Sequence, residues 1–229
     1  MQIKFLGTGG AFDVDFLNSA ALLEFKGINI LLDCGFTVFP TMVNKNLINK
    51  VDHILITHLH NDHCGSLATM LLYKNIIEKS PRPVIIYPSE QFRQQLYAFL
   101  QLQVKDVDKY VEFVPIEHFE GITCVDTFGQ HSEQMQTYAF IFDDEYRIAY
   151  SGDLGKPEAL FDKLEKMPSM PTHVYHDITF NPDNTSHTYY KRLLPYMNGH
   201  ELFGYHCDPT KNPSDNPIRL VFYQKDLMA

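Results

Sequence analysis

A dense run of metal-binding side chains constrains this chain more than any other feature of its sequence. The run consists of His58, His60, Asp62 and His63, four donors within six positions. The apolar residues at 54–56 predict a buried strand before the run, and the apolar spacing over 65–80 predicts a helix after it. The four donors therefore lie on the turn between a strand and a helix, as expected for a metal site.

The side chains of this turn divide into two pairs. His58 and His60, at alternate positions, can project the same way, whereas Asp62 and His63 turn to the other side of the opening. One motif can then supply two adjacent ions. The alternative is a cluster of surface histidines, which is disfavoured because neutral imidazoles so close together gain little from solvent and much from a shared cation.

Short strands and a few helices account for most of the remaining pattern. Strands are predicted at 2–6, 19–25, 28–33, 52–57, 84–87, 111–116, 122–128, 136–142, 146–151, 173–178, 201–205 and 218–223. Further helices are predicted at 89–101, 157–167 and 186–197. Two strand-rich halves, each with helices, indicate two sheets packed face to face and covered outside by helices. No domain boundary is evident, so residues 1–229 are expected to form a single domain.

The composition fits an enzyme-sized globular protein. The 229 residues are 45% hydrophobic, which allows a substantial core. A formal net charge of -9 gives no general electrostatic footprint for nucleic acid. Because no apolar stretch approaches membrane-spanning length and no signal-peptide core opens the chain, we expect a cytoplasmic protein with no membrane partner. The four cysteines lack CxxC spacing and are expected to be reduced thiols.

A two-metal site needs about seven protein donors, so partners for the histidine run should lie at the ends of other strands. Three residues hold such positions: His131 after one predicted strand, Asp153 in a Ser-Gly-Asp turn after another, and His206 after a third. Taken singly, each fits an ordinary loop residue better than a ligand. Their order along the chain is more informative.

The order His-x-His-x-Asp-His, then His, Ser-Gly-Asp and His resembles the metallo-β-lactamase superfamily, and the resemblance covers nearly the whole chain. It implies an α+β fold, an αββα sandwich of two mixed β-sheets flanked by helices, with a dinuclear site between the sheet edges. On this resemblance, His58, His60 and His131 hold one metal ion, Asp62, His63 and His206 hold the other, and Asp153 bridges the two. Asp33 would orient the histidine turn. Zn²⁺ is the favoured divalent ion, and Mn²⁺ and Fe²⁺ are alternatives.

Two further segments are similar to the phosphodiesterase branch that contains tRNase Z. The sequence His176-Asp177-Ile178-Thr179-Phe180 resembles the branch's His-Glu-Ala-Thr-Phe motif, and Ser186-His187-Thr188 resembles its His-Ser-Thr motif. The resemblance implies that Asp177, in place of glutamate, supports His187 as a general acid that protonates the departing sugar oxygen. Asp62 would orient a metal-bound hydroxide that attacks phosphorus. The alternative for His187 is a neighbour of a helix cap without a catalytic role.

A missing insertion bears on the substrate. One subgroup of the branch carries a long tRNA-gripping arm between the equivalents of His131 and Asp153, but here 21 residues separate them and two predicted strands nearly fill the interval. Without the arm, the chain resembles compact members that hydrolyse small cyclic nucleotides, including the phage anti-Pycsar phosphodiesterases. We therefore expect hydrolysis of 3′,5′-cyclic mononucleotides, cyclic pyrimidine nucleotides among them. The resemblance also implies a homodimer.

Other functions stay open on the sequence. A tRNA 3′-processing endoribonuclease would share the motifs, although the acidic composition disfavours it. A thioester or lactone hydrolase would share the metal ligands, since only residues 176–188 argue for phosphate. The complete ligand set argues against a metal-binding protein without catalysis. Residues 180–185 and the pair Tyr189-Tyr190 are candidates for contacting a nucleobase, or for packing beneath a helix.

Overall fold

Two six-stranded sheets form the centre of the protein in the computed structural model, which describes residues 1–229. In spatial order, the first sheet contains β1 (Gln2–Gly7), β2 (Ala20–Phe25), β3 (Ile28–Leu32), β4 (His53–Leu55), β5 (Val84–Tyr87) and β6 (Glu112–Pro115). The second contains β7 (Ile122–Asp126), β8 (Tyr138–Asp143), β9 (Arg147–Tyr150), β10 (Thr172–Asp177), β11 (Glu201–Tyr205) and β12 (Arg219–Leu220). Each half of the chain therefore builds one sheet.

Both sheets follow the same plan. In the first sheet β2 is antiparallel to both of its neighbours, β1 and β3. β4, β5 and β6 then continue the sheet from β3, each parallel to the strand before it. In the second sheet β7, β8 and β9 are antiparallel, and β10, β11 and β12 add in parallel. The predicted pair of mixed sheets is confirmed. Because parallel strands end at the same edge, each sheet gathers the carboxyl ends of several strands in one place.

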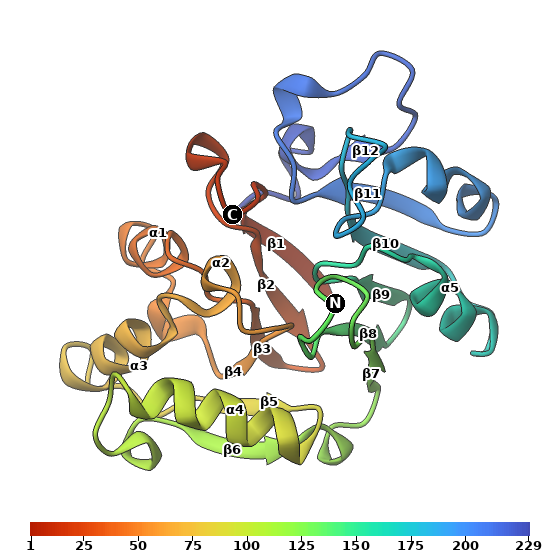
Figure 1. Ribbon diagram of the computed structural model, residues 1–229. Coiled ribbons are helices and arrows are strands. Elements are labelled where there is room, and N and C mark those ends of the chain that lie inside the picture. Colours follow the sequence, from red (N-terminus) through yellow and green to blue (C-terminus); the bar gives the residue numbers. More distant parts are fainter.

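Helices lie on the outer sides of the two sheets. The α-helices are α1 (Val38–Asn44), α2 (Asn61–Cys64), α3 (Leu67–Ile76), α4 (Glu90–Gln101) and α5 (Glu158–Glu165). The 3-10 helices are η1 (Val14–Phe16), η2 (Ile48–Lys50), η3 (Val107–Lys109), η4 (Ile116–His118), η5 (Tyr190–Asn198), η6 (Pro209–Lys211) and η7 (Val221–Tyr223). Figure 1 shows α1, α3 and α4 beside the first sheet and α5 beside the second. No helix is both long and apolar enough to cross a bilayer.

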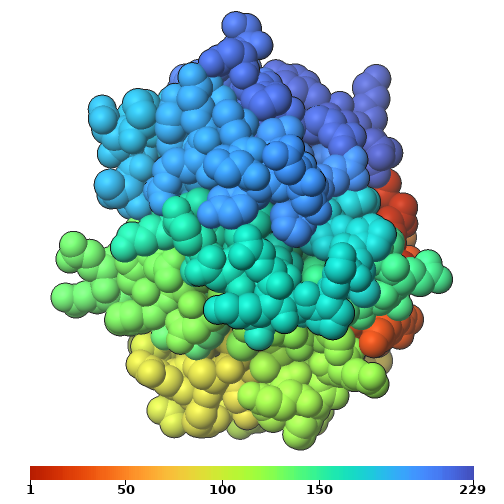
Figure 2. Space-filling model, turned by 90° about the vertical axis from the view of Figure 1, so that its right-hand side faces the viewer, coloured from red at the N-terminus to blue at the C-terminus, as the bar shows by residue number.

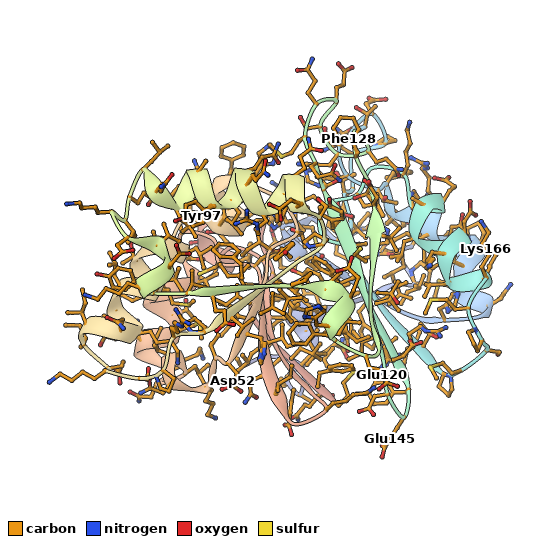
Figure 3. All side chains as sticks on the ribbon, turned by 90° about the horizontal axis from the view of Figure 1, so that it is seen from below. Asp52, Tyr97, Glu120, Phe128, Glu145 and Lys166 are labelled. Atoms are coloured by element: carbon orange, nitrogen blue, oxygen red, sulfur yellow. The ribbon has the colours of Figure 1, made fainter.

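Strand alternation divides the apolar side chains between two cores. On β8, Phe140 and Phe142 join the larger core of 42 residues, which includes the first sheet, whereas Ala139 and Ile141 join a core of 16 residues that includes Phe161 of α5. Figure 3 shows α4, which carries Tyr97, and α5, next to Lys166, on opposite sides of these packed side chains. From the side of α5, the C-terminal half of the chain covers the middle and top of the molecule (Figure 2). The second sheet is therefore apolar on both faces.

The predicted helix at 65–80 is shorter in the structure. It corresponds to α3, which runs only from Leu67 to Ile76, while a separate one-turn helix, α2, forms before it inside the histidine turn. Between the two helices, the Ser66 hydroxyl donates a hydrogen bond to the Gly35 carbonyl and accepts one from the Phe39 amide, which ties this point to the loop after β3. Helix α1 was not predicted from the sequence. Its seven residues include valine, phenylalanine and threonine, which are poor helix formers.

Two C-terminal predictions also needed correction. The helix predicted at 186–197 is the 3-10 helix η5, which begins at Tyr190 and contains Pro195, and Ser186 does not cap it. The Thr188 hydroxyl donates to the Leu154 carbonyl, which holds the preceding segment outside the helix. The strand predicted at 218–223 has only two residues before η7. By contrast, Ser89 caps α4 as predicted, since its hydroxyl accepts the Phe92 amide at 3.2 Å.

Candidate metal centre

The predicted site residues follow the carboxyl ends of strands from both sheets. The histidine turn follows β4, Asp153 follows β9, and His206 follows β11 directly. In Figure 3, Phe128, three residues before His131, lies at the edge opposite to Asp52, the residue before β4. The strands of both sheets therefore deliver their donors to one edge of the sandwich, where ligands commonly bind in sheets with parallel strands.

One group of donors consists of three histidines. The His60 Nδ1 atom lies 3.0 Å from the Nε2 atoms of both His58 and His131. Zinc–nitrogen bonds of about 2.0–2.1 Å at tetrahedral angles place ligand nitrogens roughly 3.3 Å apart. His58 is fully buried, and the other two are partly exposed. The three nitrogens therefore have the spacing of ligands to a single ion.

The second group consists of Asp62, His63, Asp153 and His206, all buried. The Asp62 Oδ2 atom lies 3.3 Å from Nε2 of His63 and 3.3 Å from Nε2 of His206. This group contains two carboxylates, so it carries more negative charge than the first group. The histidine turn thus supplies both groups, with His58 and His60 on one side and Asp62 and His63 on the other.

Asp153 faces both groups. Its Oδ1 atom is 3.3 Å from His63 Nε2 and 3.4 Å from His206 Nε2. Its Oδ2 atom is 3.8 Å from His58 Nε2 and 3.6 Å from His131 Nε2. A single carboxylate with one oxygen toward each group can bridge two cations.

Hydrogen bonds on the far side of the rings fix which nitrogen faces the site. The His63 Nδ1–H donates to Asp33 Oδ2 at 2.9 Å, and the His131 Nδ1–H donates to the Ser186 carbonyl at 2.9 Å. These hydrogen bonds occupy Nδ1 and leave Nε2 of each ring facing the site. Asp33 also accepts hydrogen bonds from the Thr57 amide and hydroxyl, and so holds the start of the turn. Asp33 therefore occupies the orienting position expected from the sequence.

Charge and unsatisfied polar atoms fit a divalent metal site. Burial lowers the pKa of His63, but the charges of Asp153 and Asp33 and the hydrogen bond to Asp33 hold that pKa well above its ordinary value. Burial raises the pKa of Asp62, yet the hydrogen bond with His206 and the nearby His63 ring hold it well below its usual range. His63 Nε2 and Asp153 Oδ1 are buried without a hydrogen-bond partner. The cluster therefore attracts positive charge and leaves buried ligand atoms for a cation.

Asp177 and His187 form a hydrogen-bonded pair beside these groups. The His187 Nδ1–H donates to Asp177 Oδ2 at 2.9 Å, and the same nitrogen is 3.9 Å from Asp153 Oδ2. Burial lowers the pKa of His187, but the hydrogen bond to Asp177 and the charges of Asp153 and Asp177 raise it to about 9. The shorter aspartate side chain thus reaches His187. On the other side of Asp177, the buried His176 Nδ1 lies 3.0 Å from Oδ1.

A cavity of about 490 Å³ gives access to the donors. Its lining includes His60, Asp62, His131, Asp153 and His187, together with Ala11, Phe12, Phe36, Asn61, Ser132 and Ser186. The sequence reasoning did not identify Phe12 and Phe36. The available signal was an aromatic residue shortly after a glycine turn at the end of β1 and of β3.

The segment expected to contact a nucleobase is only partly near this cavity. Tyr190 is buried, and its hydroxyl donates to Asp215 at 2.8 Å, so the packing alternative is correct for this residue. Phe180, Asn181 and Asn184 line a neighbouring cavity of about 330 Å³. That cavity shares Phe12 and His187 with the larger one.

A protein family and several individual proteins are similar to this chain. A family model described as "Anti-Pycsar protein Apyc1" matches residues 1–220. The anti-Pycsar protein Apyc1 of Paenibacillus harenae is 27% identical over 207 residues, covering 85% of this chain and 83% of that protein. The protein of the same name from Bacillus phage BSP38 is 27% identical over 219 residues, covering 86% and 83%.

A solved structure shows the same fold. The metallo-β-lactamase fold protein YhfI from Bacillus subtilis superimposes with a TM-score of 0.70 at 18% identity, covering 93% of this chain and 89% of that chain. At such low identity the likeness concerns the fold alone. It confirms the αββα sandwich predicted from the sequence.

Proposed function

Because the chain belongs to the anti-Pycsar protein Apyc1 family, we propose that it is a metal-dependent phosphodiesterase that hydrolyses 3′,5′-cyclic mononucleotides, cyclic pyrimidine nucleotides among them. Membership of this family and the metallo-β-lactamase fold support a metallo-hydrolase. The observation that carries the finer proposal is the position of the Asp177–His187 pair, on the same cavity as two groups of donors that share Asp153.

The donor groups suit two divalent ions, of which Zn²⁺ is favoured for the histidine-rich group and Mn²⁺ or Fe²⁺ are alternatives. We assign His58, His60 and His131 to one ion and Asp62, His63 and His206 to the other, with Asp153 between them. When bound, such a pair of ions supplies a water activated at neutral pH and charge stabilisation at the phosphoryl group.

The protein's own residues then position and move protons. Asp62 lines the cavity and is ionised, so it can accept a hydrogen bond from the attacking water and orient it. His187 uses Nδ1 to bind Asp177, which leaves Nε2 for the substrate. With its raised pKa the ring is protonated at neutral pH and can donate a proton to the departing sugar oxygen. The water oxygen forms a bond to phosphorus and gives up a proton to solvent, the bond to the sugar oxygen breaks, and the proton from His187 completes the new sugar hydroxyl.

Size and charge support a small substrate. A cavity of about 490 Å³ is in the range typical of small-molecule sites. Only 21 residues lie between His131 and Asp153, and β8 and β9 take ten of them, which leaves too little length for a long protruding arm. The net charge of -9 disfavours binding to a polyanion. These features favour a cyclic nucleotide over precursor tRNA.

A substrate panel tests the proposal. The protein, with its metal content measured on the same sample, is assayed with cyclic purine and pyrimidine nucleotides, a precursor tRNA, bis(p-nitrophenyl) phosphate, a lactone and a thioester. We expect turnover of cyclic nucleotides and a metal content near two ions per chain. Turnover of only the lactone or thioester would overturn the proposal. The cytoplasmic location and the homodimer remain predictions, and a solution mass measurement tests the second.

A further inference from the structure

Two exposed phenylalanine rings stand at the mouth of the site cavity. Phe12 is 94% exposed and Phe36 is 57% exposed. Both line the cavity that also contains Asp62 and His187, and Ala11 is the only other apolar residue in its lining. Exposing a phenylalanine ring to water forfeits much of its hydrophobic stabilisation. Two such rings at one opening therefore suggest a planar apolar partner.

Each phenylalanine is carried by backbone that runs close to the metal centre. A side chain at Gly65 would come within 2.8 Å of the Phe36 ring, so that ring packs against the end of α2. A Cβ at Gly35 would overlap the Asp62 carbonyl, which shows how closely the backbone beside Phe36 approaches the histidine turn. Phe36 is therefore held beside the second donor group.

Phe12 lies near the same group from another direction. A Cβ at Gly10 would lie 3.2 Å from Cε1 of His206, so the loop that carries Phe12 passes directly beside this ligand candidate. The Gly10 amide donates to Asp13 Oδ2 at 2.9 Å, which closes the loop around Phe12. This loop joins β1 to β2 and projects from the molecule in Figure 1.

We propose that Phe12 and Phe36 form a stacking site for the nucleobase of the substrate, which rests on the phosphodiesterase function proposed above. The phosphodiester would lie at the donor groups, and the base would lie against the two rings at the cavity mouth. An acyl chain is a poorer match because the rest of the lining, including Asn61, Ser132 and Ser186, is polar. These polar groups can hydrogen-bond to the edge of a base, whereas the rings contact its face.

Stacking makes a specific kinetic prediction. Removing an aromatic ring that stacks on a base weakens base binding by about 5- to 150-fold. Phe12→Ala and Phe36→Ala should therefore raise KM for a 3′,5′-cyclic nucleotide by about that factor, with little change in kcat and in metal content. Because every base has an aromatic face, purine and pyrimidine nucleotides should both be affected.

The experiment compares a cyclic nucleotide with a ribose 3′,5′-cyclic phosphate that lacks the base. Phe12→Ala and Phe36→Ala are expected to raise KM only for the nucleotide. Phe12→Trp keeps an aromatic face and should have a KM close to that of the wild-type protein. Phe128→Ala is the matched control, because Phe128 is 55% exposed and lies outside the cavity. Metal content and thermal unfolding are measured on every variant.

The two possible failures can be told apart. If the wild-type protein hydrolyses cyclic nucleotides but neither variant changes KM, or if both substrates change equally, the stacking site is overturned and the phosphodiesterase function stands. If the metal-loaded wild-type protein neither hydrolyses nor binds a cyclic nucleotide in calorimetry, both proposals are overturned.

Discussion

The two halves of the molecule follow one strand plan but contribute to the site in different ways. The first half supplies four donors from a single turn after β4, whereas the second half supplies Asp153, His131 and His206 from three separate connections. The first arrangement is local, since a few backbone angles and the Asp33–Thr57 hydrogen bonds hold it. The second depends on strand register across the sheet, which is antiparallel from β7 to β9 and parallel from β9 to β11. The site thus combines donors held by one local turn with donors that meet only when the strands of the second sheet pair.

Close packing joins these two parts. Gly152 has a φ of +57°, and a Cβ there would lie 2.8 Å from Cβ of Thr57. The glycine therefore lets the turn of the second sheet approach the start of the histidine turn, and it places the neighbouring Asp153 between both donor groups. The second half supplies fewer donors than the first, but one of them, Asp153, lies between the two donor groups.

The largest effect should follow from removing the shared carboxylate. Asp153→Ala deletes the oxygens that face both donor groups, so we expect loss of both ions and a fall in kcat/KM of about a thousandfold or more. His60→Ala, which changes only the first group, should retain the ion of the second. Elemental analysis of metal per chain, with activity, measures the difference. Retention of two ions by Asp153→Ala would contradict the bridging role of Asp153 and the central position of the second half in the site.

The next effect concerns proton donation from the second half. His187→Ala should lower kcat by about 10²- to 10⁴-fold for a cyclic nucleotide, whose leaving oxygen needs a proton, and far less for a p-nitrophenyl ester. The metal content should stay unchanged: His187 lies close to His131 and Asp153, but its Nδ1 binds Asp177 and it is not one of the residues assigned to the two ions. The measurement is kcat of the wild-type protein and of His187→Ala on both substrates, which differ in their leaving groups.

His173→Ala is the matched control for this variant. His173 lies on β10, pairs with Glu201 at 2.8 Å and is not among the cavity residues. Equal slowing of activated and unactivated substrates by His187→Ala would exclude a general-acid role.

A smaller effect is expected from the support of the histidine turn in the first half. Asp33→Asn keeps the size of the side chain but removes the carboxylate that accepts the His63 Nδ1–H. Loss of such an orienting partner typically weakens metal binding about 10- to 100-fold. Competition with a chelator measures the affinity, and Asp52→Asn, at the residue before β4, is the control. Unchanged affinity in Asp33→Asn would mean that the turn is rigid without this contact.

The same contrast explains what could be predicted from the sequence. Strand positions and the histidine turn were predictable because period-2 alternation and donor spacing are local signals. Asp153 and His206 needed the family resemblance, since nothing local separates a ligand from an ordinary turn residue. Phe12 and Phe36 were missed because an exposed aromatic residue has no distinctive pattern until the fold places it at a cavity. The late start of η5 depends on the tertiary contact of Thr188 with Leu154, which no local propensity encodes.

The smallest effect at neutral pH should come from Asp177→Asn, and it shows most clearly in the pH profile. Burial lowers the pKa of His187, whereas the carboxylate of Asp177 helps raise it to about 9. A general acid works only below its pKa, so activity on a cyclic nucleotide should decline as the pH rises through that value. Without the carboxylate, the alkaline limb of kcat should move to lower pH by about 1–3 units. An unmoved limb would show that another group donates the proton, and the second half would then supply ligands alone.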